Sequence, residues 1–259
     1  ILVAVHLCGL PCEMEEIHLL SQEYGFHVIE DACHAIGGRY KGDLIGNCRY
    51  SDITVFSFHP VKTITTGEGG AAVTNRLELA EKMQLLRSHG ITKNPERMTQ
   101  VIDGPWYYQQ QELGYNYRMS DIHAALGVSQ LKRLDRFIER RHQIAENYDR
   151  LLRELPLQLP YRASQLFSGF HLYVVRLKID AHLQVFEQLR ERGIGVNLHY
   201  IPIHLQPYYV EMGFSKGDFI EAECYYREAI SLPIYPDLTD EQQEQVVSEL
   251  VDAIAAYKF

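Results

Sequence analysis

The chain has 259 residues, of which 46% are hydrophobic and 23% are charged, and this composition is typical of a globular protein with a sizeable core. Its 34 acidic residues outnumber its 25 basic residues, and no block of basic residues stands out, so we expect no nucleic-acid partner. No run of about 18 apolar residues is present either, so we expect no membrane-spanning helix.

The beginning of the chain has the pattern of a β-α-β unit. Residues 1–6 are mostly aliphatic and predict a buried strand, residues 13–24 predict a helix, and residues 26–29 predict a second strand that ends just before Asp31. Strands connected in this way are parallel. Because chains seldom start inside a core strand, we expect an N-terminal part of a longer protein to precede Ile1.

The later elements predict an α/β protein with a second, smaller part. We expect strands at residues 53–58, 70–74 and 171–177, helices at 77–88, 183–192 and 241–257, and a mostly helical stretch at 118–155. This pattern predicts a large domain with a mostly parallel central sheet and a small C-terminal α+β domain. We place the rest of the large domain at residues 1–125, connecting helices at 126–155, and the small domain at 156–259.

The five cysteines are Cys8, Cys12, Cys33, Cys48 and Cys224. Their number is odd and they are spread along a long chain, so we expect free thiols and no disulfide scaffold. Cys8 and Cys12 have a spacing that could suit a metal, but no second pair of ligands follows them, and we expect no metal site.

The first functional motif is EDACHAIGG, residues 30–38, at the end of a predicted parallel strand. Ligands of open α/β sheets bind at this edge, so Asp31 could serve a cofactor there. An isolated aspartate more often caps a helix or turn, and the motif alone leaves both interpretations open.

The second motif is FSFHPVKTITTGEGG, residues 56–70, in which a strand leads into Lys62 and a glycine-rich loop. Ser57, Thr65 and Thr66 offer hydroxyl donors beside it. A lone loop lysine is usually a solvated charge, but a partly desolvated lysine loses its proton more easily. Pyridoxal phosphate (PLP) needs such an amine for a Schiff base and a carboxylate for its ring nitrogen, so Lys62 and Asp31 together favour a PLP site.

The two motifs resemble the signature of the fold-type I PLP enzymes that aminate nucleotide-linked keto-sugars. The similarity continues through RSHGI (87–91), GPWYYQQQELGYNYRMSDIHAALG (104–127), GVNLHYIPIHLQPYY (195–209) and SLPIYP (231–236), so it covers essentially the whole chain. It implies an aspartate-aminotransferase-like large domain. The family's phosphate-binding turn and ring-stacking aromatic residue normally precede the segment with which this chain begins, so the resemblance also implies an N-terminal truncation.

The resemblance assigns roles to individual residues of the cofactor site. Lys62 would be the Schiff-base lysine and proton shuttle, and Asp31 would pair with the pyridinium nitrogen. His34 would lie near the phenolic oxygen of the cofactor, and Ser57 would bind its phosphate. Asn116 would reach the phosphate of the neighbouring subunit's cofactor, which implies a homodimer with shared active sites.

The substrate is also implied by resemblance. Candidates for holding the sugar nucleotide are Tyr115, Arg118, His199, Tyr200 and His204, although each histidine could instead be a hydrogen-bonded structural residue. The runs are most similar to the branch of the family that acts in pseudaminic acid biosynthesis. This branch implies a cytoplasmic enzyme that transfers an amino group, by resemblance from glutamate, to C4 of a UDP-linked 4-keto-6-deoxy-N-acetylhexosamine.

Three alternatives remain. The substrate could be another nucleotide-linked keto-sugar. Some relatives are dehydratases that carry histidine in place of the Schiff-base lysine, and the presence of Lys62 argues against that interpretation. Finally, the chain could be a catalytically incompetent dimerisation or sugar-nucleotide-binding module.

Overall fold

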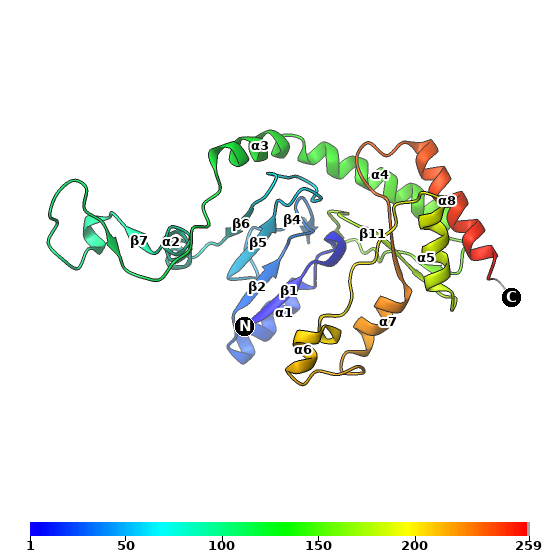
Figure 1. Cartoon of the computed structure of the whole chain (residues 1–259), viewed down its shortest axis with the longest axis horizontal. Helices are drawn as coiled ribbons and strands as arrows, with labels where there is room; N and C mark the ends of the chain where they lie inside the picture. The colour runs from blue at the N-terminus through cyan, green and yellow to red at the C-terminus, as the bar shows by residue number, and fades with distance from the viewer. Residues whose placement is uncertain (258–259) are drawn as a thin grey trace.

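A four-stranded sheet organises the N-terminal half of the computed structural model, which describes residues 1–257 (Figure 1). Its strand order is β1 (Leu2–Val5), β2 (Val28–Asp31), β5 (Ile53–Ser57) and β6 (Gly70–Val73). The first three strands are parallel, and β6 runs antiparallel to β5. The mostly parallel sheet predicted from the sequence is therefore confirmed.

The predicted β-α-β unit is present, with helix α1 (Met14–Tyr24) between β1 and β2. The helix ends at Gly25, whose left-handed backbone (φ 69°) lets its N–H reach the Ser21 carbonyl at 2.9 Å. Phe26 also donates to Ser21, at 3.3 Å, and so continues the helix end. For this reason β2 begins at Val28, two residues later than the sequence pattern predicts.

A second sheet lies in the C-terminal half, with the antiparallel order β12 (Ala229–Leu232), β11 (Tyr173–Leu177) and β9 (Leu157–Gln158). Helices α5 (His182–Glu191) and α8 (Asp240–Ala255) pack together on the same side of the molecule (Figure 1). Tyr148, Tyr173, Leu189 and Leu250 are fully buried in the core of this half.

Two helices connect the halves: α3 (Asp121–Leu131) and α4 (Leu134–Leu152). The mostly helical stretch predicted at residues 118–155 is confirmed, but its first helix begins only at Asp121, because Ser120 caps α3 by accepting a hydrogen bond from the His123 N–H at 3.3 Å. None of the residues of α3 is buried, whereas α4 contributes Ile144, Tyr148 and Leu152 to the C-terminal core.

Several short elements complete the described part of the chain. A hairpin-like pair, β7 (Ile91–Thr92) and β8 (Gln109–Gln110), lies in a segment that extends away from the rest of the molecule beyond α2 (Figure 1). The others are η1 (Leu7–Gly9), β3 (Arg39–Tyr40), β4 (Asp43–Leu44), α2 (Leu77–Leu86), η2 (Pro95–Arg97), β10 (Leu166–Phe167), η3 (Ile203–Leu205), α6 (Pro207–Glu211) and α7 (Ile220–Glu228). Among the described residues, no helix is long and apolar enough to cross a membrane.

Candidate active site

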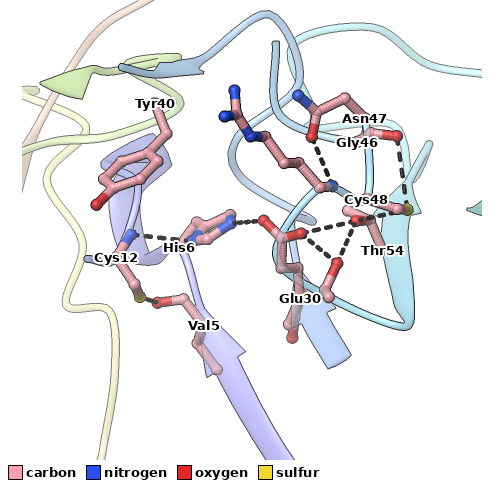
Figure 2. A network of polar contacts seen from close by, with 12 residues as sticks. Val5, His6, Cys12, Glu30, Tyr40, Gly46, Asn47, Cys48 and Thr54 are labelled. Atoms are coloured by element: carbon pink, nitrogen blue, oxygen red, sulfur yellow. Dashed lines mark hydrogen bonds and ion pairs between the residues drawn. The ribbon is translucent and has the colours of Figure 1, made fainter. Parts of the chain in front are cut away.

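A buried polar network fixes the strand that carries Asp31 (Figure 2). Its centre is Glu30, which is 3% exposed and receives hydrogen bonds from His6 Nε2 at 2.8 Å, Ser51 Oγ at 2.5 Å and Thr54 Oγ1 at 3.0 Å. These partners come from the neighbouring strands and their connections, so they hold the register of β1, β2 and β5. Successive side chains of a strand point to opposite faces, so Glu30 faces this network and Asp31 the other side.

This network gives a prediction for stability. Burial by itself raises the pKa of Glu30, but hydrogen bonds from His6 and Ser51 more than offset this, and the pKa lies below its usual value of 4.5. The stabilisation by the carboxylate is therefore present above about pH 4.5 and is lost as the pH falls through the folded-state pKa. We expect Glu30→Gln to lower the free energy of unfolding at pH 7 by about 1–3 kcal/mol.

Urea unfolding at several pH values would check this prediction, with Glu16→Gln on the exposed side of α1 as the matched control. The difference between wild type and Glu30→Gln should shrink as the pH is lowered below about 4.5. A difference that is absent at pH 7, or that grows towards acid pH, would contradict the assignment.

Asp31 ends β2 at the carboxyl edge of the sheet. The Cys33 N–H donates to its Oδ1 at 3.1 Å, which orients the carboxylate. Its backbone carbonyl accepts from the His6 N–H at 3.0 Å, so the strand end is tied to β1. The side chain is partly exposed and is available to a ligand at this edge.

Lys62 lies in the loop that connects β5 and β6. Hydrogen bonds close this loop on itself: Thr65 Oγ1 donates to the Phe58 carbonyl at 2.9 Å, and Thr66 Oγ1 donates to the Glu68 carbonyl at 2.7 Å. The hydroxyls of Thr65 and Thr66, expected to be available to a cofactor, are thus used within the loop. Ser57 differs, because its oxygen accepts only a long hydrogen bond, 3.4 Å, from the His59 N–H.

Partial burial is the main influence on the Lys62 amine. It lowers the pKa of Lys62, and the nearby Cys33 and Asp31 offset this effect only in part. A lowered pKa increases the fraction of neutral amine at neutral pH, which is the form that reacts with carbonyl compounds. The carboxylate of Asp31 is thus near enough to affect the pKa of the Lys62 amine, although 31 residues separate them.

Three histidines lie around this pair. Burial, followed by the charge of Lys62, lowers the pKa of His34 to about 4, so its ring is neutral at neutral pH. The His34 ring lies 4.5 Å from the ring of buried His171 and hydrogen-bonds through Nε2 to the Tyr200 hydroxyl at 3.3 Å. His199 bonds through Nδ1 to Ser231 Oγ at 2.8 Å, and burial together with Lys62 lowers its pKa.

The other candidates lie apart from this group. Tyr115 and Arg118 line a groove of about 1070 Å³ between β6, α2 and the segment before α3, and neither Lys62 nor Asp31 lines it. Asn116 is exposed on the same segment. His204 is 6% exposed and bonds through Nε2 to Glu223 at 2.9 Å, which is the geometry of a structural histidine.

The sequence interpretation missed two residues at the site. Cys33 follows Asp31 by two positions inside the first motif, so its proximity to the carboxylate could have been inferred from the turn. His171 has no comparable signal, because it precedes a strand that is distant in sequence from both motifs. Burial lowers the pKa of His171 further than that of His34.

Residues 1–251 match the model of the DegT/DnrJ/EryC1/StrS aminotransferase family. The chain belongs to this family. Aminotransferases of the family depend on PLP, and a sugar aminotransferase of Streptococcus pneumoniae, described as putative, has been solved in its PLP form. That structure has a TM-score of 0.89 and 26% identity to this chain, and covers 99% of this chain and 69% of its own.

Two further relatives are named for the particular sugar on which they act or in whose biosynthesis they take part. A UDP-4-amino-4,6-dideoxy-N-acetyl-beta-L-altrosamine transaminase of Campylobacter jejuni is 38% identical over 90% of this chain and 60% of its own length. The structure of Helicobacter pylori PseC, an aminotransferase involved in pseudaminic acid biosynthesis, has a TM-score of 0.90 and 31% identity, and covers 98% of this chain and 67% of its own. The chain thus spans about two thirds of the length of these family members, and the aminotransferase fold is confirmed.

Proposed function

We propose that the chain acts as a PLP-dependent aminotransferase on a nucleotide-linked keto-sugar. The observation that carries the proposal is the half-buried Lys62 amine beside Asp31 and His34 at the carboxyl edge of a parallel sheet. The set fits the cofactor chemically, because it offers an amine of lowered pKa, an oriented carboxylate and a neutral imidazole. When bound, PLP supplies the electron sink for transamination.

The residues of this chain would then divide the work. Lys62 would hold the cofactor through its amine and, once released, carry a proton between donor, cofactor and sugar. Asp31, oriented by the Cys33 N–H, would keep a proton on the ring nitrogen. His34 would donate a hydrogen bond beside the ring, and Ser57 would donate to the phosphate.

The substrate follows from the named relatives. We propose UDP-linked 4-keto-6-deoxy-N-acetylhexosamine as the acceptor, glutamate as the donor and pseudaminic acid biosynthesis as the pathway, with a cytoplasmic location. The names of the transaminase from Campylobacter jejuni and of PseC support the choice of sugar and pathway, whereas glutamate and the location rest on the family resemblance alone. We place His199 and Tyr200 at the sugar, because they lie beside His34 and Lys62.

A homodimer with shared active sites is the proposed assembly. Exposed apolar side chains on α3 and on the segment before it support the proposal, because such surfaces usually mark interfaces. They include Trp106, 72% exposed, Tyr117, 73% exposed, and Ile122, 82% exposed. Asn116 lies on this same segment, where it could reach a neighbouring subunit.

The test is a two-step assay on the purified protein. The protein is first incubated with PLP and gel-filtered, and its visible spectrum is recorded. It is then supplied with the UDP-4-keto sugar and either glutamate or aspartate, and the product is identified by mass spectrometry. Amination of the sugar that requires glutamate supports the proposal. If the protein binds PLP but aminates only a different keto-sugar, the substrate must be reassigned. If no PLP band appears, a non-catalytic binding module is favoured.

A further inference from the structure

The turn that follows β1 contacts both the site histidine and the C-terminal half of the chain. The turn is η1, Leu7–Gly9, and the Cys8 N–H donates to His34 Nδ1 at 3.3 Å. On its other side, the Gly9 carbonyl accepts from the Gly169 N–H at 2.9 Å, and the Cys8 carbonyl accepts from the Leu172 N–H at 3.3 Å. The turn therefore joins His34 to the segment that leads into β11.

The backbone of this turn is tightly confined. Cys8 has a left-handed conformation, with φ 61° and ψ 0°, which a non-glycine residue rarely adopts outside a constrained site. Gly9 has φ 101°, and a Cβ at this position would lie 2.8 Å from both the His34 carbonyl oxygen and the Phe170 nitrogen. Only glycine fits between these two backbones, so the position of the Cys8 N–H is determined by its surroundings.

This hydrogen bond determines which nitrogen of His34 carries the proton. A backbone N–H can only donate, so Nδ1 must accept and cannot itself be protonated. The neutral ring then carries its hydrogen on Nε2, from which it donates to the Tyr200 hydroxyl at 3.3 Å. The neutral state is supported by burial and by the charge of Lys62, which together lower the pKa of His34 to about 4.

We infer that the turn Leu7–Gly9 is a positioning element that fixes His34 as the Nε2–H tautomer through the Cys8 N–H. In this form the only N–H of the neutral ring is on Nε2, where the Tyr200 hydroxyl accepts it, and an anionic oxygen of a ligand bound beside Lys62 and Asp31 would receive this hydrogen bond in place of Tyr200. Because Gly169 and Leu172 bond to the same turn, the position of this donor depends on how the C-terminal half packs. The inference rests on the proposed function only in assigning PLP as that ligand.

The tautomer can be measured without the cofactor. Protein labelled with ¹⁵N at histidine, with His34 assigned by His34→Gln, should give the long-range ¹H–¹⁵N pattern of an Nε2–H imidazole near pH 7. Uniformly labelled wild type should also show a coupling across the hydrogen bond between the Cys8 amide nitrogen and His34 Nδ1. An Nδ1–H or doubly protonated ring, or a missing coupling, would overturn the inference.

Gly9→Ala tests the turn directly, because its Cβ would displace Cys8. The matched control is Gly25→Ala, which also has positive φ (69°) but whose Cβ meets nothing within 4 Å. Only Gly9→Ala should lose the single His34 tautomer. In this variant the affinity for PLP should fall by about 2- to 10-fold, which corresponds to the loss of one ordinary hydrogen bond. A folded Gly9→Ala with an unchanged His34 pattern refutes the inference.

If Gly9→Ala does not fold, as judged by circular dichroism, the coupling in wild type alone decides the inference. Two further results separate the inference from the proposed function. If wild type shows the Nε2–H pattern but no absorbance band with PLP, the proposed cofactor role fails and the assignment of the tautomer stands. If PLP binds and the pattern is that of Nδ1–H, the proposed function stands and the inference fails.

Discussion

Lys62→Ala is expected to abolish the visible absorbance band of bound PLP and to reduce amination of the keto-sugar by about 10⁴-fold, the upper end of what a positioned proton-transfer group contributes. The reason is that one amine has two roles, since it holds the cofactor and moves the proton. The burial that lowers the pKa of Lys62 makes this amine more available in its neutral form than a surface lysine.

Lys41→Ala is the matched control, because Lys41 is a lysine on the turn between β3 and β4 that pairs with Glu15 at 2.5 Å. This variant should keep both the absorbance band and the activity. Spectra recorded after gel filtration, together with initial rates at saturating PLP, make the comparison. If Lys62→Ala kept its band and its rate, the amine would have to come from another residue and the proposed site would be wrong.

Added methylamine provides a second readout for the same residue. A small amine can take over proton transfer from a missing lysine side chain if the cavity is left intact, so rescue should rise with the concentration of free amine. A merely destabilised variant would not respond in this way. Circular dichroism at the same temperature shows whether the variant remains folded.

The positions of Asp31 and Lys62 could be predicted because they depend on short-range rules. Aliphatic runs predicted β1, β2 and β5, and parallel strands present their carboxyl ends at one edge of a sheet. Asp31 ends β2, and Lys62 lies in the loop that follows β5, so both are at this edge even though 31 positions separate them. The sequence analysis therefore placed them at one site, but the contacts each makes there came only from the structure.

The surroundings of His34 could not be predicted in this way. Gly9 indicated a break in the first strand, but the contact of Cys8 with His34 spans 26 positions and depends on the turn folding back. The packing of His171 against His34 spans 137 positions and depends on how the two halves meet. No local pattern encodes such contacts, because they are set by tertiary packing of segments with little regular structure.

The smallest elements were missed for a different reason. Strands β3, β4 and β10 have two residues each, which is too short for an alternating pattern to be recognised. They form a separate three-stranded sheet through residues distant in sequence, with Leu166 opposite Tyr40. The division of the chain at residues 125 and 155 stays a prediction, and α4, which carries Ile144 into the C-terminal core, crosses most of the predicted connector.

Asp31→Asn is expected to leave the fold intact and to reduce the rate of transamination by about 10²- to 10³-fold. A reduction of this size is usual when one preorganised electrostatic partner is removed. An amide has nearly the same shape as a carboxylate, so the Cys33 N–H can still bond to its oxygen. What is lost is the negative charge that would keep a proton on the cofactor's ring nitrogen, and a neutral ring withdraws electrons poorly. Asp31→Ala should lose activity to a similar or greater extent.

The pH dependence distinguishes this electrostatic role from a structural one. In Asp31→Asn the bound cofactor's ring nitrogen should lose its proton at a lower pH than in wild type, since no carboxylate stabilises the charged form. This shift can be followed by absorbance of the loaded protein. Asp43→Asn, a partly exposed carboxylate on β4 that pairs with Arg49 at 2.9 Å, is the matched control. Near-normal turnover in either Asp31 variant, with an unshifted spectrum, would remove Asp31 from this role.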